Sequence, residues 1–158
     1  MPEAFAAASA PATLKVEESD DRVVVTLHRP QARNAIDAAM IGELHDVCAG
    51  LERQPRLLLL TGAGGVFAAG ADIAELRARG REQALQGINS RLFDRIARLP
   101  LPTVAAVDGF ALGGGAELAY ACDLRLASPT ATFGNPEPGL GILAAAGDRK
   151  STRLNSSH

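Results

Sequence analysis

Glu117 follows three consecutive glycines, Gly113 to Gly115, at a point where the sequence pattern changes from a loop to a helix. Glycine lets backbone N–H groups approach a ligand oxygen because no Cβ stands in the way. The N–H groups in the first turn of a helix also have no partner within that helix. A carboxylate three positions beyond Gly114 can reach whatever those N–H groups hold, so the arrangement is suited to chemistry on a carbonyl. A glycine triplet also permits close packing of a helix on a strand, and other segments must decide between the two interpretations.

Two further segments contain residues of the same kind. Residues 67–73, Phe-Ala-Ala-Gly-Ala-Asp-Ile, follow an apolar run, and Asp72 is placed to cap a helix after Gly70. Residues 133–137, Phe-Gly-Asn-Pro-Glu, bring a second carboxylate, Glu137. Where two carboxyl groups lie close together, their pKa values tend to separate, which allows one to act as a base and the other as an acid.

The composition predicts one globular domain or part of one, since 47% of the 158 residues are hydrophobic. A net charge of −2 disfavours a nucleic-acid-binding surface. No segment has the apolar length of a membrane span, and the first residues lack the positive charge of a secretory signal. We therefore expect a soluble, cytoplasmic protein with neither nucleic acid nor membrane as a partner. Cys48 and Cys122 lack metal-site spacing, so we predict two buried thiols and no metal.

The first third of the chain predicts a hairpin and a helix. Strands are expected at 14–18 and 23–28 with an acidic turn at 19–21. Asp37 is positioned to cap the following helix, which ends before Pro55. The apolar residues of that helix recur at helical spacing: Ile41, Leu44, Val47, Cys48 and Leu51.

The remaining elements predict parallel strands and a second helix. The continuous apolar runs 57–61 and 103–107 are typical of strands buried on both faces, and 124–127 predicts a further short strand. A helix ending before Pro100 is indicated by apolar residues at helical spacing: Leu85, Ile88, Leu92, Ile96 and Leu99. Strand, strand and helix in repetition imply an α/β fold of ββα units. Ligands bind such folds at the carboxyl ends of the strands, where the glycine clusters fall.

Four segments in this order resemble the enoyl-CoA hydratase/isomerase family, also called the crotonase family. They are Arg29-Pro30 with Asn34-Ala35, residues 68–73, residues 109–118 and residues 133–137. The resemblance covers roughly residues 13–147 and implies a crotonase-like spiral of repeated ββα units that lacks the C-terminal helical region.

Both ends of the chain fall outside that pattern. Residues 1–12, rich in Ala, Pro and Ser, are predicted to be disordered. Residues 148–158 are polar and basic and resemble the translation of a sequencing adapter. We therefore expect a non-native tail and a natural protein that continues past Gly147.

The resemblance implies an acyl-CoA substrate whose thioester oxygen is held by the backbone N–H groups of Ala71 and Gly114. It implies Glu117 as the main activator of water and Glu137 as the proton donor to C2, which together favour an enoyl-CoA hydratase. No cofactor is expected, because CoA is part of the substrate, and the full-length protein is expected to form a homotrimer or a dimer of trimers. The implied substrate-binding residues are Ala32, Ala69, Ala71, Asp72, Ile73, Phe110, Gly113, Gly114, Pro136, Glu137 and Gly141.

Several alternatives stay open at this point. An enoyl-CoA isomerase, another acyl-CoA lyase or hydrolase of the family, and a non-catalytic CoA-ester-binding fragment all fit the same scaffold. Arg29, Arg33 and Arg77 either meet CoA phosphates or lie on a solvated face. A dinucleotide loop at 62–65 is disfavoured because Phe67 stands where the third glycine would be, and a serine hydrolase because no GxSxG is present.

Overall fold

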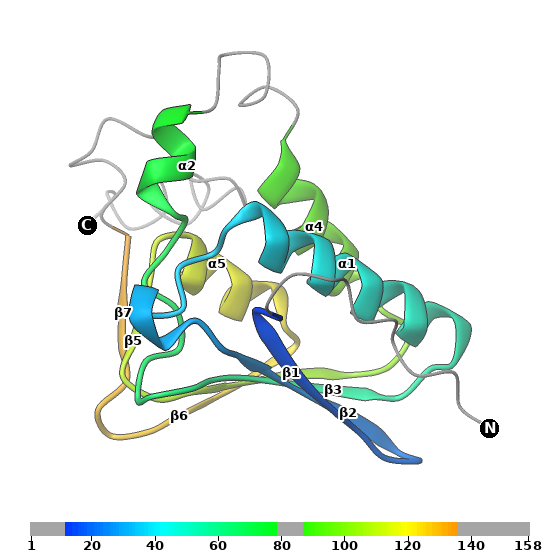
Figure 1. Ribbon diagram of the computed structural model, residues 1–158. Helices are drawn as coiled ribbons and strands as arrows, with labels where there is room; N and C mark the ends of the chain where they lie inside the picture. The colour runs from blue at the N-terminus through cyan, green and yellow to red at the C-terminus, as the bar shows by residue number, and fades with distance from the viewer. Residues whose placement is uncertain (1–11, 79–86, 136–158) are drawn as a thin grey trace, which may run out of the picture.

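The computed structural model describes residues 12–78 and 87–135 (Figure 1). Several sequence predictions lie outside those residues. They concern the disordered segment up to residue 11, Leu85, Pro136, Glu137, Gly141 and the tail 148–158.

The described chain forms a five-stranded sheet with helices on one side, and a smaller two-stranded sheet (Figure 1). The large sheet has the order β1-β2-β3-β4-β6, in which β1 is antiparallel to β2 and the other pairs are parallel. The small sheet pairs β5 with β7 in parallel. The elements are β1 (Leu14–Glu18), β2 (Arg22–Leu27), η1 (Pro30–Ala32), α1 (Ala38–Arg53), β3 (Leu57–Gly62), α2 (Ile73–Ala78), α4 (Ile88–Ala97), β4 (Thr103–Val107), β5 (Phe110–Leu112), α5 (Gly114–Ala121), β6 (Leu124–Ala127) and β7 (Thr132–Gly134).

The predicted ββα repeat is confirmed, with one difference in its composition. Each parallel strand of the large sheet is followed by a short extended segment in a second layer. Those segments pair in turn through a parallel bridge of Ile36 with Ala71, a parallel bridge of Ala68 with Ala111, and the β5–β7 ladder. The first predicted strand, β1, is an antiparallel addition at the sheet edge and no part of the repeat.

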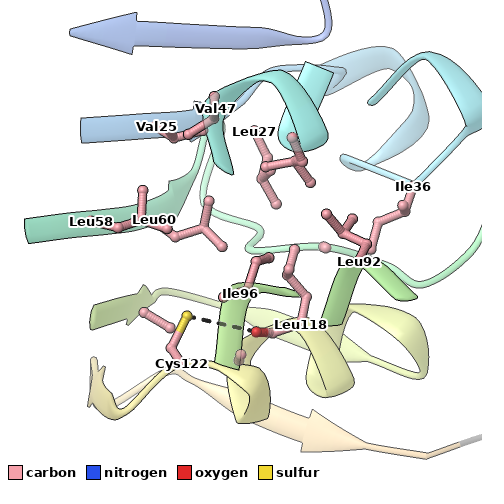
Figure 2. Close-up of a cluster of buried hydrophobic side chains, with 14 of the residues drawn as sticks. Val25, Leu27, Ile36, Val47, Leu58, Leu60, Leu92, Ile96, Leu118 and Cys122 are labelled. Carbon is pink, nitrogen blue, oxygen red and sulfur yellow. Dashed lines mark hydrogen bonds between the residues drawn. The ribbon is translucent and has the colours of Figure 1, made fainter. Parts of the chain in front are cut away.

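The core lies between the large sheet and the helices α1, α4 and α5 (Figure 1). Side chains alternate along a strand, so one side of each strand supplies the core. Val25 and Leu60 from neighbouring strands belong to the same buried cluster as the helix residues Val47, Ile96 and Leu118, as Figure 2 shows. Burying each such Leu or Ile contributes about 1.5–3 kcal/mol.

The second face of the large sheet is more open than the sequence predicts. Leu57 is 40% exposed, whereas the apolar run 57–61 predicts a strand buried on both faces. In β6, Leu124 is 57% and Leu126 64% exposed. The prediction of burial on both faces is therefore wrong for Leu57, because the described helices cover only the other face of the sheet.

The helix α1 begins and packs as its sequence predicts. The Asp37 carboxylate accepts a hydrogen bond from the Met40 N–H at 2.8 Å, which caps the first turn. The predicted apolar stripe is buried, including Leu44 and Cys48. Cys48 and Cys122 are both free and buried, which confirms the prediction of two buried thiols. Their burial raises the pKa of Cys48 to about 12 and that of Cys122 to about 11.

Candidate active site

The backbone N–H of Ala71 is oriented by its neighbours. Ile36 donates its N–H to the Gly70 carbonyl at 2.8 Å and accepts the N–H of Asp72 at 2.9 Å. In a parallel pair, a residue that bonds to the positions on either side of its partner leaves that partner's own N–H and C=O directed away from it. Ala71 therefore points its N–H away from Ile36.

The backbone N–H of Gly114 lies at the start of α5. Gly113 is the N-cap, with φ of 51° and ψ of −121°, a conformation that only glycine adopts readily. The Gly113 N–H donates to the Gly134 carbonyl at 2.8 Å, which ties the cap to β7. As the first helical residue, Gly114 has no acceptor for its N–H within the helix.

These two N–H groups come from separate segments that lie against each other. A Cβ built on Gly114 would be 3.5 Å from the Ala71 nitrogen, and one built on Gly70 would be 4.0 Å from the Gly114 nitrogen. The bridge between Ala68 and Ala111 holds the two segments in this register. The structure therefore brings together the two residues that the sequence analysis proposes as an oxyanion hole.

Glu117 lies in the first turn of the same helix and is 3% exposed. Its N–H donates to the Gly113 carbonyl at 3.0 Å, so the residue belongs to the regular helix. A helix N-terminus favours a negative charge. Burying a carboxylate costs free energy unless hydrogen bonds or opposite charges compensate it. Glu117 lies within the same first helical turn as the Gly114 N–H.

Asp72 caps α2, as predicted. Its Oδ1 accepts the N–H of Ala74 at 3.0 Å and that of Glu75 at 3.3 Å. Partial burial raises the pKa of Asp72, but hydrogen bonds from the Glu75 N–H and the Arg29 guanidinium lower it by more. The net pKa lies below that of an ordinary aspartate, and the side chain stays ionised.

Arg29 has partners that the sequence analysis did not identify. Its Nε lies 3.2 Å from Asp37 Oδ2, and its Nη1 lies 3.2 Å from Asp72 Oδ2 and 2.7 Å from the Ala35 carbonyl oxygen. The Arg29 side chain is 17% exposed. The guanidinium is thus held by the protein and does not lie on a solvated face, whereas its contact with CoA phosphates stays a prediction. For one of these partners the sequence contained an indication, because Asp37 is a predicted capping carboxylate eight positions after Arg29.

Asn34 also makes hydrogen bonds that the sequence alone does not predict. It is fully buried, and its amide donates to the carbonyls of Ala63 at 2.9 Å and Val66 at 2.8 Å. Its Oδ1 accepts the N–H of Arg29 at 2.9 Å. Asn34 therefore fixes the glycine loop that follows β3, which agrees with a structural and not a dinucleotide-binding loop.

The other predicted binding residues lie in or beside these segments. Ala69 donates its N–H to the Arg33 carbonyl at 3.0 Å, and Ala32 ends η1 next to that arginine. Phe110 and Ile73 are 51% and 52% exposed. Arg33 and Arg77 are exposed, and Arg77 lies in the last turn of α2. Pro136, Glu137 and Gly141 lie outside the described residues, so the second carboxylate stays a prediction.

Within residues 12–78 and 87–135, no helix is long and apolar enough to cross a membrane. Within the same residues, no group of three His, Cys, Asp or Glu side chains is placed to hold a metal ion.

Several known proteins are similar to this chain in sequence and in fold. Residues 17–153 match the family Enoyl-CoA hydratase/isomerase. The short-chain-enoyl-CoA hydratase of Clostridium acetobutylicum is 42% identical over a 147-residue alignment that covers 88% of this chain and 56% of that protein. The crotonyl-CoA hydratase of Syntrophomonas wolfei is 39% identical over a 137-residue alignment that covers 84% of this chain and 53% of that protein.

Solved structures of proteins named enoyl-CoA hydratase have a fold similar to that of this chain. The enoyl-CoA hydratase from Thermoplasma volcanium GSS1 superposes with a TM-score of 0.80 and 34% identity, over 87% of this chain and 56% of that one. Pseudomonas aeruginosa AtuE superposes with a TM-score of 0.81 and 40% identity, over 89% and 57%. The chain thus spans about half the length of the curated relatives it matches. The predicted crotonase-type α/β fold is confirmed, and the chain belongs to the enoyl-CoA hydratase/isomerase family.

Proposed function

We propose that this chain carries the thioester site of an enoyl-CoA hydratase, which adds water reversibly to a trans-2-enoyl-CoA. The observation that supports the proposal is the placement of the Ala71 nitrogen and Gly114 beside each other, with buried Glu117 one helical turn away. Relatives named short-chain-enoyl-CoA hydratase and crotonyl-CoA hydratase support the same activity.

The two N–H groups act on the oxygen of the thioester. Attack of water at C3 pushes electrons toward the carbonyl, so the oxygen of the enolate-like state carries negative charge. Donors that are already in place stabilise that charge without reorganising during the reaction, and loss of one such donor costs about 3 kcal/mol. Ala71 and Gly114 contribute backbone groups, so their side chains act on the site only through the space that they occupy beside the substrate oxygen.

The carboxyl groups of Glu117 and Glu137 carry out the two proton transfers. In this proposal Glu117 takes a proton from the water that attacks C3, and Glu137 delivers a proton to C2. A positioned acid or base of this kind contributes about 10²–10⁴-fold to the rate. Hydration with two acids needs no cofactor, since CoA is already part of the substrate. We further propose that the full-length protein is a cytoplasmic homotrimer or dimer of trimers, as the family resemblance implies.

The experiment follows the absorbance of the conjugated enoyl thioester. Hydration removes the conjugated double bond, so we expect the absorbance of crotonyl-CoA to fall when the purified chain is added. An unchanged absorbance, together with turnover of a 3-enoyl-CoA, would favour an isomerase on the same scaffold. Binding of both thioesters without turnover of either would favour a non-catalytic CoA-ester-binding role.

A further inference from the structure

One guanidinium connects the caps of two helices beside the candidate site. Arg29 Nε faces Asp37 Oδ2, and Arg29 Nη1 faces Asp72 Oδ2, both at 3.2 Å. The two carboxylates use their other oxygens to cap α1 and α2. All three side chains are largely withdrawn from solvent, with exposed fractions of 17% for Arg29, 14% for Asp37 and 20% for Asp72.

The same guanidinium also contacts both segments that orient Ala71. Its Nη1 donates to the carbonyl of Ala35 at 2.7 Å on one segment and meets Asp72 on the other. Ala35 precedes Ile36, whose hydrogen bonds to Gly70 and Asp72 direct the Ala71 N–H. Arg29 therefore spans the parallel bridge on which the direction of that N–H depends.

Ala71 itself has little means of holding its peptide in place. Its side chain is a single methyl group, and the preceding Gly70 has φ of +111°, in a region where glycine is conformationally free. A peptide in this position keeps one orientation only if its neighbours fix it. The Arg29 contacts are the charged part of that restraint.

We propose that Arg29 is a positioning residue for the thioester site, which clamps Asp72 to the 35–36 segment and so fixes the Ala71 N–H toward the substrate oxygen. The proposal rests on the proposed function, because it assigns a direction to one of the two oxyanion donors. Misplacement of a reacting group by about 1 Å can cost about 100-fold in rate, so a small loosening of this peptide matters.

The readout must separate positioning from simple stabilisation. A thioester C=O that accepts strong hydrogen bonds stretches at a lower frequency, so the infrared band of bound butyryl-CoA, labelled with ¹³C at the carbonyl, reports the two donors directly. Butyryl-CoA has no double bond to hydrate, and the band is recorded at saturating ligand. The variants are Arg29→Met, Arg29→Lys and Asp72→Asn, the last of which keeps a capping oxygen but removes the charge.

Arg56 provides the matched control. It is 6% exposed and pairs with Glu18 at 2.9 Å, and it also donates to the Ser19 carbonyl at 3.1 Å, at the opposite end of the large sheet from the site. Arg56→Met removes an ion pair of similar burial without touching residues 29–37 or 70–72. Arg56→Met is expected to lower the midpoint of thermal unfolding. The frequency of the carbonyl band of bound butyryl-CoA should equal that in the unchanged protein.

The proposal predicts a downward shift of the band in the unchanged protein, most of it lost in Arg29→Met and part of it kept in Arg29→Lys and Asp72→Asn. A full shift in Arg29→Met overturns the proposal and leaves the proposed function standing. If Arg29→Met does not fold, a full shift in both milder variants overturns it equally. Absence of any shift in the unchanged protein with butyryl-CoA bound contradicts the oxyanion hole itself, and with it both proposals.

Discussion

The backbone nitrogen of Ala71 lies 3.5 Å from the position that a Cβ on Gly114 would occupy. This places two segments, each following a different strand of the large sheet, within contact of one another at the start of α5. At this distance a methyl group fits at Gly114, but a larger side chain would meet the Ala71 nitrogen. Substitutions at Gly114 therefore test the geometry of the site.

Gly114→Ala is expected to keep the fold and lose activity. A Cβ at 3.5 Å makes ordinary van der Waals contact with the Ala71 nitrogen, and the backbone of Gly114 lies in a helix that accepts alanine. The methyl group, however, would stand beside the Ala71 N–H and crowd the substrate oxygen. Turnover of crotonyl-CoA should fall by about 100-fold, as for loss of one oxyanion donor, while the thermal midpoint stays near that of the parent.

Gly115→Ala is the neighbouring control for that substitution. A Cβ there would overlap the Ala68 carbonyl oxygen and lie 2.8 Å from the Ala68 Cβ, so the backbone of the 67–72 segment would have to move. Overpacking of this kind costs about 1–3 kcal/mol, so unfolding by urea should occur at a lower concentration. Equal stability of the two variants would contradict the packing described around α5.

Glu117→Gln tests the carboxylate without changing its size. Glutamine keeps the shape of the side chain but cannot take a proton from water, so turnover should fall about 10²–10⁴-fold with little change in the circular dichroism spectrum. Glu43→Gln is the control, because Glu43 is a partly buried acid on α1 that accepts the N–H groups of Thr13 and Leu14. Full turnover by Glu117→Gln would remove this residue from the mechanism.

The parts of the structure that could be predicted from the sequence are those fixed by local patterns. Alternating or continuous apolar runs predicted the strands of the large sheet, and Asp37 predicted the start of α1 to the residue. The three-residue strands β5 and β7 were not predicted, because three residues show no periodicity. Leu124 and Leu126 are exposed although they are apolar, since burial depends on what covers a sheet face and not on the strand alone.

The site divides in the same way. The placement of Gly114 and Glu117 at the start of a helix and the capping role of Asp72 followed from glycine spacing and helix-start chemistry, whereas their catalytic roles rest on the family resemblance. The contact of Arg29 with Asp72 joins residues far apart in the chain, and its existence depends on the bridge between Ile36 and Ala71. Isolated arginines give no such signal in a single sequence, which explains why that contact had to come from the structure.

Stability should decline as the pH falls through the range in which His45 titrates. Burial, and then the charge of Arg95, lowers the pKa of His45 below its ordinary value of 6.5; the Arg95 Nη1 lies 3.1 Å from His45 Nδ1. The unfolded chain therefore binds the proton at a higher pH than the folded one. This contribution is complete above pH 6.5 and is lost as the pH falls through the lowered pKa of the folded state.

Urea unfolding at pH 7.5 and at pH 5.5 measures that decline, and His45→Gln should make the difference between the two pH values smaller. Glu52, which pairs with the same Arg95 at 2.7 Å, has a pKa lowered from 4.5 and so remains ionised across this interval. A pH dependence that is unchanged in His45→Gln would mean that another group titrates here.

The two thiols should be unreactive until the chain unfolds. Burial raises the pKa of Cys48 to about 12 and that of Cys122 to about 11, and the side chains are 1% and 3% exposed. The thiolate is the reactive form, and the raised pKa values keep both groups as thiols at pH 8. Figure 2 shows Cys122 within the core, where its Sγ lies 3.7 Å from the Leu118 carbonyl oxygen as a weak donor. Mass spectrometry after iodoacetamide treatment should find no added group on the native chain and two on the chain in urea. Alkylation of the native chain faster than its measured unfolding rate would contradict the burial of these residues between the large sheet and its helices.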